Sequence, residues 1–500
     1  MKMTVTTQVL ELKMLINGEW RLSSNPDTNK VINPANGELI AIAPRATIEE
    51  TEEAIKAAKE TFESGVWSKL SAQERADYLL KIADKIDEKH DELVELEVKD
   101  NGKIKAEADI DISDAASCFR YYAGLIRIPD GQTYHVADPM QAMVIREPVG
   151  VTGLIVPWNF PFLMSVWKFA PALAAGNTIV YKPAEVTPVT ATKLVEIIES
   201  VGVPKGVVNL VLGKGSVIGE VIAASHDVDM VSFTGSTEVG RSIMRNAAGN
   251  LKKISLELGG KSPNIIFADA DFEAAVDHAL LGIFYGSGQV CSAGSRIIVE
   301  ERIYDQFVKE FVRRAKNIKV GPGLEEGSEM GAIVSEAQLT TILDYIEIGK
   351  QEGATLACGG NRLIENGLDK GFFVEPTVFI DVTPEMRIVK EEIFGPVAVI
   401  QKFKDEEEAI KLANDTIYGL AGGVFTSDGA KALRVIKQVR AGITWINAYG
   451  PTYNEAPWHG YKQSGIGSSL GTFGLDEFQE VKQININLAV GPTGWFSNNQ

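Results

Sequence analysis

From about residue 150 onward, short apolar segments of the chain alternate regularly with helical segments, and few folds accommodate this pattern. The apolar segments are residues 151–156, 178–181, 207–212 and 228–233, and each is followed by a stretch with helical periodicity. Strands that are apolar on both faces and alternate with helices are typical of a parallel sheet covered on both sides. The sequence therefore predicts an α/β fold.

A second alternation begins near residue 260 and predicts a second α/β unit. Its strand-like segments are 262–268, 295–301, 354–360 and 372–381, and its helical segments are 271–285, 302–316 and 336–352. A chain of 500 residues is too long for one hydrophobic core, so more than one domain is expected in any case.

Helical periodicity also runs through residues 47–125, ahead of the first alternation. We expect Thr47 to cap the first of these helices and Gly65 to end it. Further on, we expect Thr187 to cap a helix that has Pro188 in its first turn.

Two segments with alternating polar and apolar residues, 141–150 and 480–488, lie outside both predicted sheets. Exposed strand edges need covering. We therefore expect these two segments to pair with each other and with another subunit.

The charge balance excludes several classes of partner. There are 49 lysine and arginine residues against 67 aspartate and glutamate residues, a net charge of −18. Such a surface repels phosphate backbones and anionic lipid, so neither nucleic acid nor a membrane surface is an expected partner. The N-terminal segment has no signal-peptide pattern, and no apolar run is long enough to span a membrane.

Cysteine and histidine are scarce in this chain. Three scattered cysteines predict no disulfide framework and fit a reducing compartment such as the cytoplasm. The five histidines do not have zinc-ligand spacing, so no metal site is predicted.

Open α/β sheets bind ligands at the carboxyl ends of their strands, where two glycine-containing loops lead into helices. These loops are GKGSVIG at 213–219, which includes Gly215, and TGSTEVG at 234–240, which includes Gly235 and Ser236. Free amides at a helix N-terminus bind phosphate, although such loops are also simple tight turns, and the first departs from the usual dinucleotide fingerprint. Glu185 follows a neighbouring strand, where a carboxylate would bind a ribose 2′-hydroxyl and repel a 2′-phosphate. The pattern favours NAD over NADP.

Cys291 stands among glycine, serine and alanine residues in the segment 288–296. Most cysteines are small buried hydrophobes, and Cys118 and Cys358 fit that interpretation. The small neighbours of Cys291 would instead admit a substrate, so that a thiolate there could attack a carbonyl carbon. Glu257 ends an apolar strand-like segment before a double glycine. Such surroundings would raise its pKa and suit a general base, and a surface or helix-capping glutamate is the alternative.

Five segments together resemble the NAD(P)-dependent aldehyde dehydrogenase superfamily. They are PWNFP at 157–161, FTGSTEVG at 233–240, LELGGKSPN at 256–264, GQVCSAGSR at 288–296 and EEIFGPV at 391–397. They occur in the family's order and spacing, and the resemblance covers nearly the whole chain. It implies a Rossmann-like cofactor domain, a second α/β catalytic domain and a small β flap for oligomerisation, in a homotetramer. The respective residues are 1–128 with 149–258, 259–464, and 129–148 with 465–500.

The resemblance implies NAD-dependent oxidation of an aldehyde to a carboxylic acid. Cys291 matches the nucleophile, which forms a thiohemiacetal and then a thioester. Asn159 matches the amide that holds the oxyanion together with the backbone N–H of Cys291. Glu257 matches the base that activates water to hydrolyse the thioester, and Lys168 matches a further residue of the catalytic neighbourhood. The matching cofactor contacts are Trp158, Lys182, Glu185, Gly215, Gly235, Ser236, Glu392 and Phe394.

Two positions depart from the family pattern. Ser468 and Ser469 stand where many relatives carry Arg-Glu. That glutamate is often assigned to proton relay, so the relay is open to question here. His459 stands where relatives usually have glycine, near the expected mouth of the substrate channel.

Four aromatic residues match positions that line the substrate tunnel of the family: Phe160, Trp167, Tyr285 and Trp458. An aromatic box suits a trimethylammonium head through cation–π contact, and the flanking segments resemble betaine-aldehyde dehydrogenases somewhat more than other members. The same positions are aromatic in relatives that oxidise simple aldehydes. Betaine aldehyde or a related aminoaldehyde is therefore one predicted substrate, and a broad range of aliphatic, aromatic or retinal-type aldehydes is the other.

Two further classes of function are weighed against hydrolytic oxidation. A CoA-acylating or phosphorylating enzyme would waste its thioester by keeping a hydrolytic base such as Glu257. A non-catalytic relative would have no need of Cys291, Asn159 and Glu257 together.

Overall fold

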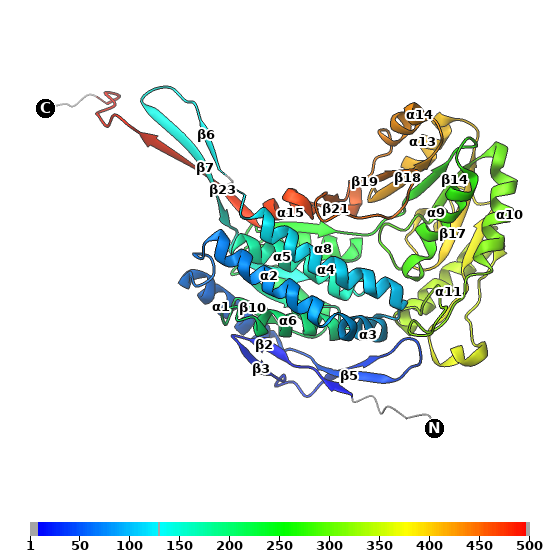
Figure 1. The fold of residues 1–500 in the computed structure, drawn as a ribbon, viewed down its shortest axis with the longest axis horizontal. Helices are drawn as coiled ribbons and strands as arrows, with labels where there is room; N and C mark the ends of the chain where they lie inside the picture. Colours follow the sequence, from blue (N-terminus) through cyan, green and yellow to red (C-terminus); the bar gives the residue numbers. More distant parts are fainter. Residues whose placement is uncertain (1–8, 129–130, 497–500) are drawn as a thin grey trace.

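The computed structural model describes residues 9–128 and 131–496. The outer ends of the predicted segments 1–128 and 465–500, and the start of 129–148, fall outside the described residues. Figure 1 shows two sheet-based units side by side and an arm that leaves the first of them.

The first unit is built on an eight-stranded sheet with the order β21-β12-β11-β8-β9-β10-β2-β3. Its five central strands are parallel. Four of them correspond to the apolar segments of the sequence, and the fifth ends in Glu257. They are β8 (Val151–Ile155), β9 (Thr178–Lys182), β10 (Val208–Leu210), β11 (Met230–Thr234) and β12 (Lys253–Glu257). The edges are β2 (Met14–Ile16) with β3 (Glu19–Arg21), and β21 (Gly465–Ile466), all antiparallel to their neighbours.

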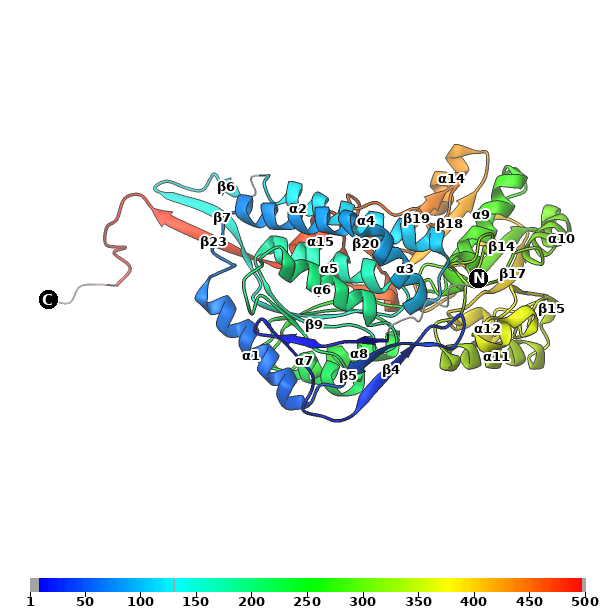
Figure 2. The same cartoon turned by 60° about the horizontal axis from the view of Figure 1, so that its bottom comes forward.

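Helices cover both faces of this sheet (Figure 2). One face carries α2 (Ala72–Glu88), α3 (His90–Asn101), α4 (Lys105–Leu125), α5 (Pro161–Ala175) and α6 (Val189–Ser200). The other carries α1 (Ile48–Ser64), α7 (Glu220–Ala224) and α8 (Thr237–Ala247). All five residues of β8, β9 and β11 are buried, as the apolar pattern requires.

The second unit is a seven-stranded sheet with the order β15-β16-β17-β14-β13-β18-β19. Its strands are β13 (Pro263–Ile266), β14 (Arg296–Glu300), β15 (Thr355–Cys358), β16 (Thr377–Ile380), β17 (Val397–Phe403), β18 (Ala421–Phe425) and β19 (Ile443–Ile446). Its helices are α9 (Phe272–Phe284), α10 (Tyr304–Ala315), α11 (Glu336–Gln351), α12 (Arg387–Lys390), α13 (Glu406–Asn414) and α14 (Gly429–Ile436). The predicted α/β fold is confirmed in both units.

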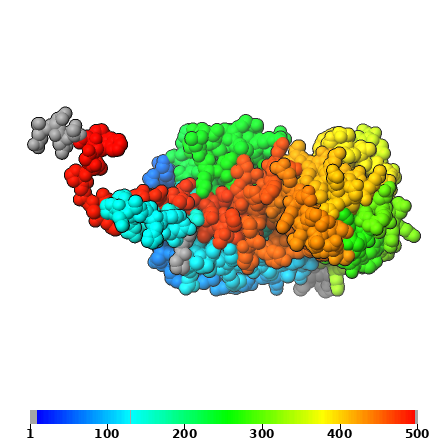
Figure 3. Space-filling model, turned by 90° about the horizontal axis from the view of Figure 1, so that it is seen from above, coloured from blue at the N-terminus to red at the C-terminus, as the bar shows by residue number. Residues whose placement is uncertain are grey.

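The arm consists of β6 (Gln132–Tyr134), β7 (Met140–Pro148) and β23 (Gln479–Asn487). The expected pairing of the two segments with each other is confirmed, because β7 and β23 run antiparallel from Met140 opposite Asn487 to Pro148 opposite Gln479. Figure 3 shows the arm, cyan and red, extending away from the body of the molecule.

Residues 465–477 were grouped with the arm in the sequence analysis, but they lie against the first sheet. β21 pairs with β12, and α15 (Gly471–Glu477) packs near α5. Two small sheets complete the fold: β1 (Leu10–Glu11) and β4 (Thr28–Ile32) flank β5 (Leu39–Pro44), and β20 (Trp458–His459) pairs with β22 (Ser468–Ser469).

The ends of α1 follow the prediction. The Thr47 hydroxyl accepts a hydrogen bond from the Glu50 amide, the Glu50 carboxylate accepts one from the Thr47 amide, and Gly65 ends the helix with a φ of 77°.

The predicted cap of α6 is wrong. Thr187 donates its hydroxyl to the Trp158 carbonyl instead, and the amides of Val189 and Thr190 donate to one oxygen of Asp100 at 2.9 and 3.4 Å. Asp100 lies in α3, 89 positions before Val189, so no local pattern announced this cap.

Replacing Asp100 with alanine is expected to lower the free energy of unfolding by about 1–3 kcal/mol, because two buried amides lose their acceptor. Asp100→Asn keeps an acceptor oxygen and should cost less. Denaturant titration of both variants measures the loss in the free energy of unfolding. Equal losses in the two variants would show that the charge of the carboxylate, and not its capping hydrogen bonds, stabilises the fold.

No helix among residues 9–128 and 131–496 has the length and apolar character that a membrane crossing demands. In the same residues, no group of three or more His, Cys, Asp and Glu side chains is arranged to hold a metal ion.

Candidate active site

The loop that carries Cys291 lies between α9 and β14 and is shaped by residues with positive φ. Gly286, Ser287 and Gly288 have φ values of 59°, 56° and 69°. A Cβ at Gly288 would lie 2.2 Å from the carbonyl oxygen of Gly395, so only glycine allows the two segments to approach this closely. The loop is thereby held against the segment that carries Phe394.

Asn159 follows β8 and reaches the same loop. Its side-chain amide is buried and donates a hydrogen bond to the carbonyl of Gln289 at 2.9 Å, two residues before Cys291. The backbone before α5 is held in turn by Asn101, whose amide donates to the Trp158 carbonyl at 2.8 Å. An amide donor therefore lies beside the cysteine loop.

Glu257 is the last residue of β12 and its carboxylate is buried. Neither carboxylate oxygen has a hydrogen-bond partner among the described residues. Burial raises the pKa of Glu257, and the nearby Lys168 ammonium opposes that rise. Lys168, in α5, donates to the Ser232 hydroxyl at 3.0 Å, and burial lowers its pKa. An orphaned buried carboxylate with a raised pKa is suited to taking up a proton.

Cys291 itself is partly exposed. Desolvation of its thiol and the carboxylates of Glu392 and Glu257 raise the pKa of Cys291 to about 12. Both carboxylates therefore act on the thiol electrostatically. In this state the thiol is protonated at neutral pH, so a reaction at its sulfur needs a base or a change in the surrounding charge.

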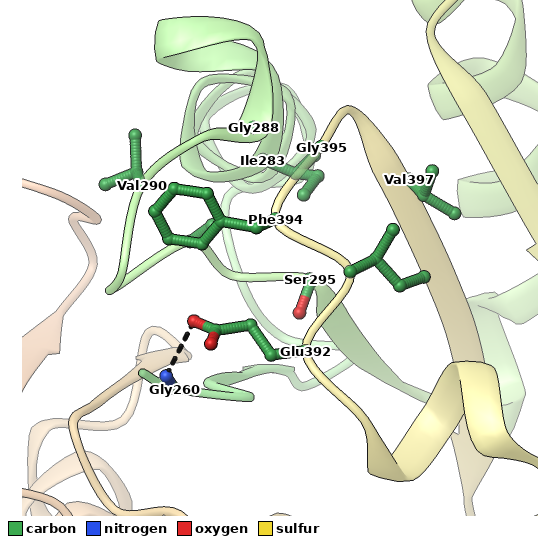
Figure 4. Close-up of a pocket in the computed structure, with 11 residues that line it drawn as sticks. Gly260, Ile283, Gly288, Val290, Ser295, Glu392, Phe394, Gly395 and Val397 are labelled. Carbon is green, nitrogen blue, oxygen red and sulfur yellow. Dashed lines mark hydrogen bonds between the residues drawn. The ribbon is translucent and has the colours of Figure 1, made fainter. Parts of the chain in front are cut away.

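Glu392 and Phe394 lie on the segment against which the Cys291 loop is held. Figure 4 shows the Glu392 carboxylate directed at the amide of Gly260, which donates to it at 2.9 Å. Burial raises the pKa of Glu392 to about 7. The rings of Phe394 and Trp158 meet edge to face with centroids 5.1 Å apart, so a residue that follows β8 of the first sheet contacts one that precedes β17 of the second.

Apart from Glu392 and Phe394, which precede β17 of the second sheet, the predicted cofactor residues lie at the carboxyl edge of the first sheet. Lys182 ends β9, and a Cβ at Gly215 would be 3.3 Å from its ammonium. Burial lowers the pKa of Lys182 to about 8. Ser236 caps α8 through the Val239 amide, and the amide of Gly235 donates to the Glu257 carbonyl at 3.1 Å.

The first glycine loop does not enter a regular α-helix. Residues 215–219 form a π-helical turn that leads into α7, a helix of five residues. The loop at Ser236 therefore leads into the longer of the two helices, α8, which has eleven residues.

The four predicted tunnel residues come from three segments. Phe160 and Trp167 lie seven residues apart at the start of α5 and along it, and Trp167 meets Trp458 edge to face with centroids 5.7 Å apart. Tyr285 begins the turn that leads to Cys291, and burial, together with the carboxyl groups of Asp111 and Glu107, raises its pKa. The Lys103 ammonium lies 4.4 Å from the centre of the Phe160 ring, so a cation of the protein itself already occupies one face of that ring.

The two departures from the family pattern are cross-strand neighbours. His459 lies opposite Ser468, and Trp458 lies opposite Ser469, in the β20–β22 pair. His459 is held by the Gly467 carbonyl, 2.6 Å from its Nδ1. The Ser469 hydroxyl lies near the Glu257 carboxylate and lowers the pKa of Glu257. The pair therefore borders both the predicted base and a predicted tunnel residue.

Arg45 is a residue of this region that the sequence analysis missed. It forms an ion pair with Glu185, in which Arg45 Nε lies 2.7 Å from a carboxylate oxygen. The two residues are 140 positions apart, so nothing in the local sequence signals the contact.

Fold and site together define an enzyme of the aldehyde dehydrogenase class: two α/β units, a cysteine loop held by an asparagine amide, and a buried glutamate. The model of the aldehyde dehydrogenase family matches residues 20–484. The chain belongs to the aldehyde dehydrogenase family, which confirms the predicted resemblance.

Among its relatives, the chain is 49% identical to the betaine aldehyde dehydrogenase of Bacillus subtilis (strain 168), over 97% of this chain and 99% of that protein. It is 46% identical to aminoaldehyde dehydrogenase 2, peroxisomal, of Pisum sativum, over 97% of each. The crystal structure of betaine aldehyde dehydrogenase from Staphylococcus aureus in complex with NAD⁺ superposes with a TM-score of 0.96 at 47% identity, covering 98% of this chain and 97% of that one.

Proposed function

We propose that this chain oxidises an aldehyde to the carboxylic acid with NAD, and that betaine aldehyde is its preferred substrate. The observation that carries the reaction is the buried Glu257 carboxylate, without hydrogen-bond partners, near the Cys291 loop. The names of the relatives support betaine aldehyde, and the NAD⁺ complex of the Staphylococcus aureus protein supports the cofactor.

The residues at the carboxyl edge of the first sheet, together with Glu392 and Phe394 from the second unit, fit a dinucleotide. Lys182 and Glu185 would hold the adenosine ribose, the amides at Ser236 a phosphate, and Glu392 the second ribose, with Gly215, Gly235, Trp158 and Phe394 shaping the cleft. When bound, NAD supplies the acceptor for the hydride that leaves the substrate carbon.

The chain's own residues perform the remaining steps. The sulfur of Cys291 bonds to the aldehyde carbon while its proton passes to solvent, and the Asn159 amide with the Cys291 N–H stabilises the oxyanion. After hydride loss the substrate is a thioester on Cys291. The ionised Glu257 carboxylate takes a proton from water, the water oxygen bonds to the acyl carbon, and the carbon–sulfur bond breaks. The proton then passes from Glu257 to the Cys291 sulfur, which restores both groups. Lys168 is proposed to stabilise the ionised form of Glu257.

Asn159→Ala should lower kcat by roughly 10²–10³-fold, the effect of removing one oxyanion donor, with a much smaller change in KM. Steady-state kinetics with betaine aldehyde would measure it. A loss confined to KM would mean that Asn159 only shapes the binding site.

Substrate preference is tested with betaine aldehyde and 3,3-dimethylbutanal, which has the same shape without the positive charge. Trp167 and Trp458 are buried aromatic side chains in contact with each other, and an aromatic ring attracts a cation more strongly than a neutral group of the same shape. We expect kcat/KM for betaine aldehyde to be roughly tenfold higher or more, the effect of one desolvated cation–π contact. Equal rates would favour the alternative, a broad-specificity aldehyde dehydrogenase.

We also propose a homotetramer in the cytoplasm, built through the arm and with the domain division predicted from the sequence, except that residues 465–477 belong to the first unit. The exposed strand β23 at the edge of the arm sheet supports assembly, and the few cysteines support a reducing compartment. Light scattering of the pure protein would give four chain masses for the tetramer and two for a dimer.

A further inference from the structure

Two glycines, Gly259 and Gly260, lie between Glu257 at the end of β12 and the start of β13. The amide of Gly260 donates to one oxygen of the Glu392 carboxylate at 2.9 Å (Figure 4), and a Cβ at Gly259 would overlap the other oxygen. A Cβ at Gly260 would lie 2.5 Å from the Cys291 carbonyl oxygen. The two glycines are therefore where the proposed base, the nucleophile loop and Glu392 meet.

The side chain of Ser464 is fully buried and holds the first of these glycines. Its hydroxyl donates to the Gly259 carbonyl at 2.7 Å and accepts from the Gly419 amide at 2.9 Å. The Ser464 carbonyl accepts a hydrogen bond from the Leu258 amide at 2.8 Å. Glycine has the most freely rotating backbone of any residue, so a segment with two glycines depends on such contacts for one fixed conformation.

Ser464 is itself anchored to the second unit. It ends a short turn in which the Lys462 ammonium donates to the carbonyls of Asn414 and Thr416, both at 3.0 Å, on the segment that leads to β18. Directly after the turn, β21 pairs with β12, the strand that ends in Glu257. The Ser464 hydroxyl therefore joins the two units at the point where the chain passes from one to the other.

We propose that Ser464 is a positioning residue for the reaction. Its hydroxyl holds the two glycines so that the carboxylates of Glu257 and Glu392 both keep their places beside the Cys291 loop. The inference rests on the proposed function, in which Glu257 acts on the thioester and Glu392 holds the second ribose. A hydroxyl suits this place because it donates and accepts at once, and an alanine would do neither.

The replacement Ser464→Ala should affect both carboxylates. We expect kcat with betaine aldehyde to fall by roughly tenfold to hundredfold, since a reacting group misplaced by about 1 Å costs up to about that much. The dissociation constant of NAD should rise by roughly threefold to tenfold, the effect of one ordinary hydrogen bond. Steady-state kinetics measures the first quantity, and isothermal titration without aldehyde measures the second.

Two double-mutant cycles show whether Ser464 acts through these carboxylates. In the background Glu257→Gln, adding Ser464→Ala should lower the steady turnover by less than about threefold, because the base that it positions is already absent. In the background Glu392→Ala, it should change the dissociation constant of NAD by less than about twofold. Loss of stability alone would give the same effect in every background.

The matched control is Thr377→Val. Thr377 is fully buried in β16, and its hydroxyl likewise donates to a backbone carbonyl, that of Glu375, and accepts from a backbone amide, that of Gly360. This variant should lower the midpoint of thermal unfolding as Ser464→Ala does, and it should keep kcat and the affinity for NAD. If Ser464→Ala does not fold, Ser464→Cys has nearly the same shape with a weaker donor and should show smaller effects in the same directions.

Three results would overturn the proposal. They are unchanged kcat and NAD affinity in Ser464→Ala, equal effects of this replacement in all backgrounds, and an equal loss of kcat in Thr377→Val. Each would mean that the Ser464 hydroxyl only stabilises the fold. If the single variants Glu257→Gln and Glu392→Ala themselves left turnover and NAD binding unchanged, the proposed function would have failed first, whatever the result at Ser464.

Discussion

Cys291→Ala is expected to abolish NADH formation, with a loss in kcat on the order of 10⁴-fold or more, because the substrate carbon then has no nucleophile to bond to. The position is a loop held by the Asn159 amide and acted on by the charges of Glu257 and Glu392. Steady-state assays with betaine aldehyde and NAD measure the loss.

The matched control is Cys358→Ala. Cys358 is a buried cysteine in β15, with its thiol near the Pro376 carbonyl, and this variant should keep its rate. Thermal unfolding of both variants separates loss of chemistry from loss of fold. Retained activity in Cys291→Ala would contradict the assignment of the nucleophile and favour a non-catalytic or differently catalysed role for this site.

Glu257→Gln should separate the two halves of the reaction. The isosteric amide keeps the shape of the site but cannot accept a proton, so the thioester should form and then persist. We expect a burst of NADH approaching one per active site, followed by steady turnover reduced by roughly 10²–10⁴-fold. Stopped-flow absorbance measures both phases.

An added nucleophile distinguishes slow hydrolysis from slow acylation. Hydroxylamine cleaves thioesters without a protein base, so, added after excess aldehyde has been removed, it should free the Cys291 thiol of acylated Glu257→Gln. If it does not, and the burst is also absent, the main task of Glu257 is to deprotonate Cys291. Coenzyme A should not raise the wild-type rate, and a strong increase would favour the CoA-acylating alternative.

The same carboxylate sets the expected pH dependence. Burial raises the pKa of Glu257, so its basic form becomes populated only at pH values above the ordinary carboxyl range. The wild-type deacylation rate should therefore rise between about pH 6 and pH 9, and this rise should be lost in Glu257→Gln. A flat wild-type profile would argue that water is activated elsewhere.

Much of the architecture follows from local patterns in the sequence. The short apolar segments of the sequence form β8, β9, β10 and β11, since a strand buried on both faces tolerates few polar side chains. The capping box at Thr47 and the glycine at Gly65 delimit α1, because these signals act within a few residues. The arm pairing was also predictable, because two alternating segments outside the sheets had edges to cover.

The sequence also indicates that the reactive groups lie at the ends of strands or in loops. Cys291 lies in a loop and Glu257 ends β12, as the small residues and the double glycine indicated. Their roles remain predictions until the variants above are measured.

Other features exist only because distant segments meet in three dimensions. Asp100 caps α6, although Thr187 stood in the usual position, since its carboxylate reaches the helix from α3. Arg45 pairs with Glu185 across the edge of the first sheet, and Ser468 lies opposite His459. Local periodicity determines which residues form a helix or strand, but a hydrogen bond or ion pair between distant residues depends on how those elements pack. For that reason the sequence alone determined the elements and the reactive groups, and the tertiary structure decided which charges surround them.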